Sequence, residues 1–293
     1  MRREETDMNG IDISNWQKGI DLDNVPFDFM ICKATQGTTF VDRYCDTFVQ
    51  KAIRLGKPWG VYHYVNGSNA EAEATHFVEA CKGYIGNGIL AVDWERDQNR
   101  QWGNLSYLRL LVSAIIDKTN IQPLIYASAS SFPWDIAREL NCGTWVAQYA
   151  NERATGYQND PWNENAYTCT IRQYSSCGKL PGYGNYLDLN KAYITAAQWA
   201  EYANPSGNDT DSTATVDVLQ LATDTIKGKY GTGIPRKEAL GSNYEAVQAK
   251  VNNLYTKAND VIKGKYGNGS ARKEALGSEY AIVQYIVNDI LDC

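Results

Sequence analysis

The sequence predicts an α/β domain built on a mainly parallel sheet, followed by a small all-α module. Short apolar runs alternate with helix-like segments in the first part of the 293-residue chain, a pattern typical of a parallel sheet, either open or closed into a barrel. A polar, turn-forming segment at 204–213 then separates this part from a tail that contains an internal repeat. Hydrophobic residues make up 43% of the chain and charged residues 21%, as in an ordinary globular protein.

The expected elements of the first part follow from these apolar runs. A first strand should precede Asp12, and further strands are expected at 29–34, 59–64, 89–95 and 123–127. Helices are expected between them at 42–55, 69–83 and 106–119. After about residue 140 the helical pattern fades, and two more strands are indicated at 145–149 and 170–174.

The tail contains two copies of one sequence unit. IKGKYG at 226–231 recurs at 262–267, and RKEALG at 236–241 recurs at 272–277, both at an offset of 36 residues. Apolar residues in each copy fall at helical spacing, so we expect two three-helix bundles. The expected boundaries are 1–203 for the α/β domain, 204–215 for a linker, and 216–255 and 256–293 for the two repeats.

The composition excludes several classes of function. The formal net charge is −6, from 28 basic and 34 acidic residues, so we expect no nucleic-acid partner. The chain has no run of 18 apolar residues and its charged start does not resemble a signal peptide, so neither membrane insertion nor secretion by that route is expected. Seven scattered cysteines and two histidines support no metal site and no cofactor, and free thiols are favoured over disulfides.

Carboxylates follow several of the predicted strands. Asp93 and Glu95 end one apolar run, Asp12 follows the first strand, and Asp188 lies near the end of the domain. In a barrel of this kind the strand ends meet at one mouth, and residues two apart on a strand face the same side. Two close carboxyls favour a state in which one keeps its proton, which suits glycoside cleavage by one acid and one anion. A solvated strand end or a helix cap is the alternative interpretation.

An ordered series of short motifs resembles glycoside hydrolase family 25 lysozymes over about residues 8–203. The motifs begin at Asp12 (DISNWQ), Lys33 (KATQG), Gly60 (GVYHY), Asp93 (DWE), Trp145 (WVAQY), Gln173 (QY) and Asp188 (DLN). The resemblance implies a flattened (β/α)5(β)3 barrel, similar to a TIM barrel. It also implies cleavage of the β-1,4 bond between N-acetylmuramic acid and N-acetylglucosamine in bacterial peptidoglycan. Gln36 departs from the family, which often has a glutamate there.

The same resemblance assigns roles to individual residues. It implies that Glu95 is the general acid and that Asp93 orients the substrate N-acetyl group or stabilises an oxocarbenium-like state. Asp12 and Asp188 would complete the acidic cluster. The candidate saccharide-binding residues are Trp16, Tyr62, Tyr64, Trp94, Tyr126, Gln148, Tyr149 and Gln173. Ordinary packing is the alternative for each of the rings.

The tail resembles the CW_7 cell-wall-binding repeat of some phage lysins, through GKYGxG and RKxxLG in both copies. This resemblance implies binding to the muropeptide unit of the wall, with peptide-stem carboxylates paired to cations and tyrosines beneath a sugar face. The candidate residues are Tyr230, Arg236, Lys237, Tyr266, Arg272 and Lys273. A solvated helix face with core rings is the alternative.

Together, these features predict a phage-type endolysin, a lysozyme made in the host cytoplasm that acts at the Gram-positive cell wall after release through a holin. Its partner would be peptidoglycan. Three alternatives stay open: a bacterial autolysin of the same chemistry, a non-catalytic carbohydrate-binding protein, and a barrel enzyme acting on chitin or another glycan.

Overall fold

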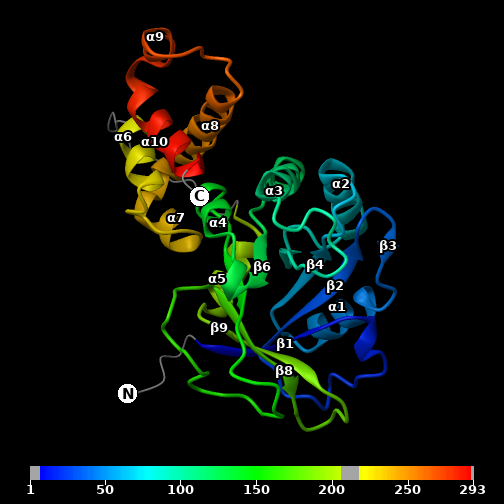
Figure 1. The fold of residues 1–293 in the computed structure, drawn as a ribbon. Helices are drawn as coiled ribbons and strands as arrows, with labels where there is room; N and C mark the ends of the chain where they lie inside the picture. The colour runs from blue at the N-terminus through cyan, green and yellow to red at the C-terminus, as the bar shows by residue number, and fades with distance from the viewer. Residues whose placement is uncertain (1–6, 206–217, 292–293) are drawn as a thin grey trace. The chain divides into compact units, whose positions relative to one another are not determined.

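The computed structural model describes residues 7–205 and 218–291, which divide between two compact units. The first unit comprises Met1–Ala137 and Cys142–Gly207, and the second comprises Arg138–Asn141 and Asn208–Cys293. We call them the barrel unit and the helical unit (Figure 1). Most of the expected linker, from residue 206 onward, and the charged start at 1–6 lie outside the described residues.

Eight strands close into a barrel in the first unit. β1 (Met8–Ile13) pairs in parallel with β2 (Phe29–Gln36) and antiparallel with β9 (Leu187–Ala192), and these two pairings close the sheet. The ring is completed by β4 (Trp59–Tyr64), β5 (Ile89–Asp93), β6 (Leu124–Ser128), β7 (Thr144–Ala147) and β8 (Ile171–Gly178). Only β9 runs antiparallel to its neighbours in this ring. The short β3 (Phe40–Val41) pairs with the end of β2 outside the ring.

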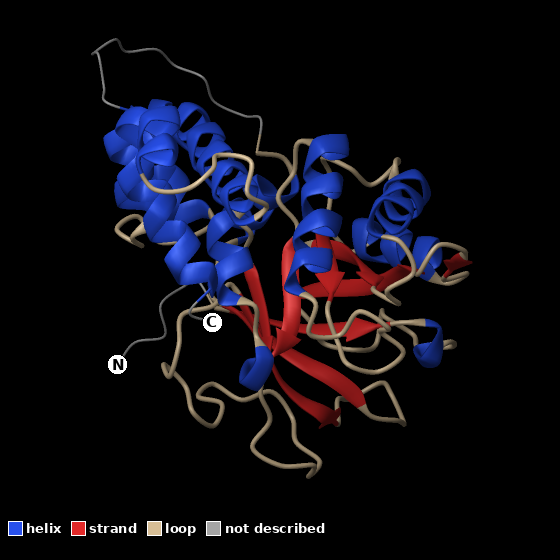
Figure 2. Ribbon diagram, turned by 45° about the horizontal axis from the view of Figure 1, so that its top comes forward, coloured by secondary structure: helices blue, strands red, loops and turns tan. Residues whose placement is uncertain are grey.

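Helices follow the parallel strands and lie beside the barrel, as Figure 2 shows in blue and red. They are α1 (Cys45–Arg54), α2 (Ala70–Cys81), α3 (Leu105–Thr119), α4 (Trp134–Glu139) and α5 (Ala196–Ala203), with 3-10 turns η1 (Asn15–Gln17) and η2 (Ala129–Ser131). The first five strands of the ring, β1, β2, β4, β5 and β6, are thus each followed by a helix or a 3-10 turn. The strands β7, β8 and β9 complete the ring, and α5 follows the last of them. This arrangement confirms the predicted fold class. Neither α4 nor α5 is among the helices that the sequence pattern predicts, and η1 takes the place of a first α-helix.

Local chemistry explains why these segments adopt their structures. The Asn104 side chain accepts the backbone N–H of Tyr107 and begins α3, and Asn120 ends it in the left-handed conformation at φ 56°. Every residue of β5 is buried, because the side chains inside the barrel cover one face and the helices cover the other. Its apolar run therefore carries Asp93 to the mouth of the barrel.

The helical unit repeats its backbone every 36 residues. It contains α6 (Val218–Ile226), α7 (Ile234–Leu240), η3 (Gly241–Asn243), α8 (Tyr244–Ile262), α9 (Ser270–Leu276), η4 (Gly277–Glu279) and α10 (Tyr280–Leu291). Gly241 and Gly277 occupy the same unusual backbone conformation, at φ 51° and 52°, which favours glycine.

The two repeats share one helix, so the described part of the tail has five α-helices where the sequence analysis expected six. The expected boundary between residues 255 and 256 falls inside α8. No glycine or proline interrupts 244–262, and Val247, Val251, Leu254 and Ala258 form a continuous buried stripe along it. The last helix of one repeat therefore continues as the first helix of the next, and both repeats contribute to a single core.

Three further observations concern the whole described chain. The six cysteines in it are free thiols, and Cys169 and Cys177 do not pair. No helix within 7–205 or 218–291 is both long and apolar enough to cross a membrane. In the same ranges, no cluster of three or more His, Cys, Asp or Glu side chains has an arrangement that could hold a metal ion.

Because the core is shared, Leu254→Ala should loosen both repeats together. The side chain is fully buried, and its truncation should lower the free energy of unfolding by about 2–5 kcal/mol. Hydrogen–deuterium exchange of the full chain should then rise in α6 and α10 alike. Asn253→Ala, at an exposed position of the same helix, should change the stability by less than about 0.5 kcal/mol. Faster exchange confined to one repeat would contradict the shared core.

Candidate active site

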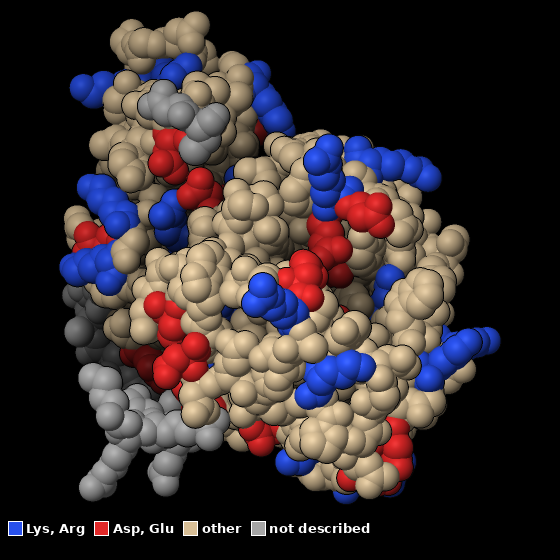
Figure 3. Space-filling view, turned by 60° about the horizontal axis from the view of Figure 1, so that its bottom comes forward, with Lys and Arg blue, Asp and Glu red and all other residues tan. Residues whose placement is uncertain are grey.

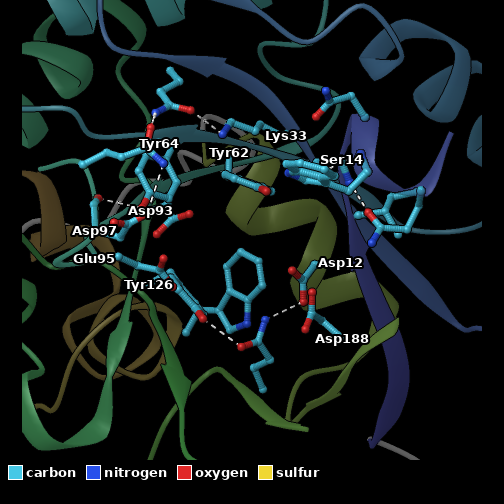
Figure 4. A pocket seen from close by; sticks show the side chains of 18 of the residues that line it. Asp12, Ser14, Lys33, Tyr62, Tyr64, Asp93, Glu95, Asp97, Tyr126 and Asp188 are labelled. Atoms are coloured by element: carbon cyan, nitrogen blue, oxygen red, sulfur yellow. Dashed lines mark hydrogen bonds between the residues drawn. The ribbon is translucent and has the colours of Figure 1, made fainter. Parts of the chain in front are cut away.

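A cleft of about 630 Å³ opens where the parallel strands of the barrel end. The four predicted carboxylic acids all line it: Asp12, Asp93, Glu95 and Asp188. Figure 4 shows them as two pairs, Asp93 with Glu95 on one side of the opening and Asp12 with Asp188 on the other. Figure 3 shows acidic side chains gathered around a hollow in the surface. The structure therefore brings together four residues that are up to 176 positions apart in the sequence (188 − 12).

Strand register places each of these acids. Asp93 is the last residue of β5 and pairs with Tyr64 on β4 and Tyr126 on β6, and Glu95 follows two residues later. Asp12 on β1 lies directly opposite Asp188 on the antiparallel β9. Directly opposed side chains on neighbouring strands have Cβ atoms roughly 5 Å apart, so these two carboxyls interact strongly.

Burial raises the pKa values of the four carboxyls, but by different amounts. Burial and the nearby Asp12 carboxylate raise the pKa of Asp188 to about 9. Burial raises the pKa of Asp12 only to about 6, because hydrogen bonds from Asn190 and Gln173 oppose the increase. Burial together with Glu95 raises the pKa of Asp93 well above its usual value. At neutral pH the cleft therefore holds both protonated and ionised carboxyls.

Glu95 is half-buried and its pKa is raised by burial, although the nearby hydroxyl groups of Tyr126 and Tyr64 partly oppose the increase. A carboxyl with these properties can keep a proton and deliver it to an oxygen in the cleft. Asp93 is 7% exposed, and its Oδ1 atom makes no hydrogen bond within the described chain. That oxygen is therefore a buried acceptor without a partner among the described residues.

One cation lies inside this acidic cleft. The Lys33 ammonium donates to Oε1 of Gln36 at 2.6 Å and lies 4.5 Å from the centre of the Tyr64 ring. Burial lowers the pKa of Lys33, while Asp93 and other carboxylates raise it. The Gln36 amide also donates to Oε1 of Gln98 at 3.1 Å. Gln36 therefore holds the Lys33 ammonium through an uncharged acceptor.

A second cavity of about 890 Å³ adjoins the first. The two cavities share Glu95, Asp97, Tyr126 and Tyr149 in their linings. Glu95 therefore lies where they meet. The second cavity is also lined by Trp102 and by Trp162, whose ring is 56% exposed.

The loop that carries Trp162 is held to the barrel by a buried arginine. Arg172 is 2% exposed, and its guanidinium donates to the carbonyl oxygens of Asn163 and Trp162 and to Oε1 of Gln148. Glu164 on the same loop accepts from the Lys191 ammonium at 2.7 Å. These contacts fix the position of the loop beside Glu95.

The predicted binding residues divide into three groups. Trp16 is 84% exposed in the lining of the first cleft, which also includes Tyr62, Tyr64, Tyr126 and Tyr149. Gln148 lies in the lining of the second cavity, whereas Gln173 is 3% exposed in the first. Trp94 is only 1% exposed and its ring stacks on Trp102 at 5.7 Å and on Tyr107 at 6.5 Å. Trp94 thus packs as a core ring and also borders the second cavity, so its predicted role in saccharide binding stays a prediction.

Both units match families of known proteins. Residues 11–183 match the family described as Glycosyl hydrolases family 25. The chain belongs to this family. Two further matches, at 220–255 and 257–291, are to the CW_7 repeat.

Proteins similar to the family 25 domain include a lysozyme and an uncharacterized protein. Lysozyme M1 of Streptomyces globisporus is 26% identical over 222 residues, which cover 67% of this chain and 71% of that protein. The uncharacterized protein YegX of Escherichia coli (strain K12) is 30% identical over 199 residues, covering 62% and 68%.

Solved structures of family 25 lysozymes have the same fold. The bacterial lysozyme from Streptomyces coelicolor is 24% identical and superposes with a TM-score of 0.55, covering 70% of this chain and all of that one. The family GH25 lysozyme from Aspergillus fumigatus is 22% identical, with a TM-score of 0.52 over 68% of this chain and all of that one.

Some residues of this family 25 site were not among the sequence-based candidates. Lys33 and Asn190 were noted only as letters within motifs, although Lys33 lies in the cleft and Asn190 touches Asp12. For Asn190 a signal existed, because it stands two residues after Asp188 on a strand and therefore faces the same side. Trp102 and Trp162 lie in loops where no periodicity indicates their direction.

The CW_7 repeats use their arginines internally. Arg236 donates to the carbonyl oxygen of Gly231 at 2.9 Å and to Gln248 at 3.0 Å, and Arg272 makes the equivalent bonds to Gly267 and Gln284 at 3.1 Å. Each arginine thus joins the GKYGxG loop to the helix after its own, which is α8 for Arg236 and α10 for Arg272. The remaining candidates are Lys237 and Lys273, together with Tyr230 and Tyr266, which pack partly against the helical core.

The raised pKa of Asp188 predicts a pH-dependent stability. Between the usual pKa of 3.8 and about 9, the folded protein keeps a proton that the unfolded chain has lost, so stability falls as the pH rises through this range. Asp188→Asn should remove this contribution. Its melting temperature should exceed that of the wild type by a margin that grows from pH 4 to pH 9. Asp117→Asn, on the exposed surface of α3, is the control, and a constant margin would contradict the assignment.

Proposed function

We propose that this protein is a peptidoglycan muramidase, a lysozyme that cleaves the β-1,4 bond between N-acetylmuramic acid and N-acetylglucosamine. The observation that carries the proposal is the position of Glu95, half-buried among other carboxyls at the junction of two adjoining cavities. A glycan chain that fills both cavities places one glycosidic oxygen beside this acid.

The residues around Glu95 support a division of roles. Glu95 donates a proton to the oxygen of the leaving sugar, because burial raises its pKa. An ionised carboxylate, for which Asp12 is the candidate, stabilises positive charge that develops at the sugar carbon. Asp93, which lines the cleft, orients the N-acetyl group. Trp16 and the tyrosines of the cleft provide flat surfaces for sugar rings.

The CW_7 repeats support a wall-bound substrate. We infer that Lys237 and Lys273 pair with carboxylates of peptide stems and that Tyr230 and Tyr266 contact sugars. Two weak sites on one chain increase the residence time on a repetitive polymer. The combination of this module with a muramidase suits a phage endolysin that acts at the Gram-positive cell wall. A bacterial autolysin has the same chemistry and differs in how it reaches the wall.

Glu95→Gln tests the catalytic assignment. The amide keeps the shape of the side chain but cannot donate a carboxylic proton, so kcat should fall about 10²- to 10⁴-fold. Clearing of purified Gram-positive walls and release of new reducing ends measure this loss. Glu79→Gln, at an exposed position on α2, should keep wild-type activity.

Three outcomes would count against the proposal. Unchanged lysis by a folded Glu95→Gln variant would remove Glu95 from the mechanism. Release of free amines without new reducing ends would identify an amidase or a peptidase instead of a glycosidase. Binding of soluble glycan fragments without any cleavage would identify a carbohydrate-binding protein.

Lys237→Ala and Lys273→Ala test the repeats. Each single variant of the full chain should bind walls several-fold more weakly, and the double variant should lose most of the bivalent gain, about 10-fold or more. Cosedimentation with purified walls measures the binding, while cleavage of soluble fragments should stay unchanged. Equal wall binding by the double variant would refute the role of these lysines.

A further inference from the structure

Two buried amides converge on a single oxygen of Asp12. Oδ2 of Asp12 accepts a hydrogen bond from Nε2 of Gln173 and another from Nδ2 of Asn190, each at 2.7 Å. Asp12, Gln173 and Asn190 are 7%, 3% and 0% exposed. Solvent therefore has little share in deciding the charge state of this carboxyl.

The orientation of the Asn190 amide is fixed by Trp145. The indole nitrogen of Trp145 lies 2.8 Å from Oδ1 of Asn190, and an indole N–H can only donate. Oδ1 must therefore face the indole, and the NH₂ group must face Asp12. Trp145 is itself held between the Tyr62 and Tyr126 rings, with centroid distances of 6.2 and 4.7 Å.

Two tyrosine hydroxyls bond the carbonyl end of the Gln173 amide. Oε1 of Gln173 accepts from the hydroxyl of Tyr126 at 2.7 Å and from the hydroxyl of Tyr149. Its NH₂ group is therefore directed at Asp12. With both amides oriented, Oδ2 of Asp12 meets two donors and has no acceptor for a proton of its own.

We propose that Gln173 and Asn190 are positioning residues that keep Asp12 ionised and leave the proton of the Asp12–Asp188 pair on Asp188. The pair lies directly opposed across β1 and β9, so the two carboxyls cannot both ionise easily. The titratable groups that act on Asp12 or are affected by it are Tyr62, Asp93, Glu95, Tyr126, Tyr149 and Asp188. None of these is a cation, so hydrogen-bond donors favour the anion at Asp12, and the two amides contribute more than the backbone hydrogen bond there.

The consequence for catalysis rests on the proposed function. Asp12 would be the carboxylate that stabilises positive charge at the sugar, and the amides would act through it without touching the sugar. Gln173, predicted from the sequence to bind substrate, would then be a positioning residue, because both ends of its amide are already bonded within the protein.

Asn190→Asp tests the proposal directly, since it replaces the NH₂ donor by an oxygen and keeps the size of the side chain. In the full chain with ¹³C-labelled aspartate, NMR titration should show Asp12 with a midpoint near pH 6, assigned by its loss in Asp12→Asn. Asn190→Asp should raise that midpoint by about one pH unit or more, and Gln173→Glu should move it in the same direction. Asn104→Asp adds the same charge at the exposed N-cap of α3 and should leave the midpoint unchanged.

Kinetics provide a second measurement. If Asp12 must be ionised, the acid limb of the pH profile of kcat/KM on soluble glycan should move to higher pH in each variant, by as much as the Asp12 midpoint moves in that variant. A purely structural loss would instead lower the rate equally at all pH values. An unchanged Asp12 midpoint in the folded variants would overturn the proposal. So would a wild-type Asp12 that stays protonated above pH 8, a result that needs no variant. A wild type that releases no reducing ends would reject the proposed muramidase, while the NMR titration would still decide the role of the amides.

Discussion

The crowding of four buried or half-buried carboxyls at one mouth of a closed barrel is the constraint on which the site depends. Removing a carboxylate from water is costly, and several together cannot all be charged. The protein responds by supplying hydrogen-bond donors to one carboxyl and withholding them from another. Asp12 receives two amide donors, whereas Oδ1 of Asp93 receives none within the described chain. This unequal supply of donors differentiates side chains that are chemically almost identical.

Closure of the sheet assembles these groups from both ends of the domain. β1 contributes Asp12, and the antiparallel β9 contributes both Asp188 and Asn190 on one face. Because β9 lies between β1 and β8, Gln173 on β8 reaches Asp12 from the other side of β9. The site is thus complete only when the last strand has closed the ring, and folding of the whole barrel precedes any chemistry.

Sequence patterns predicted the elements of the barrel well because strand alternation with helices is a local signal. The strand at 59–64 was expected at its observed limits, and the acids at the ends of strands were identified individually. The direct pairing of Asp12 with Asp188 was not predictable, because the register between β1 and β9 depends on closure of the ring. The burial of Trp94 depends on contacts with Trp102 and Tyr107, which one strand cannot indicate. The continuity of α8 was missed because repeated motifs suggested separate modules.

The helix shared by the repeats has a consequence for how this module can grow. α8 ends one repeat and begins the next, so neighbouring repeats pack against each other through a shared helix. Such an arrangement is a one-dimensional array, in which an added copy of the sequence unit would pack on the last repeat as that repeat packs on the one before it. Duplication or loss of 36 residues would therefore change the reach of the module in fixed steps, with the rotation from one copy to the next set by the helix itself.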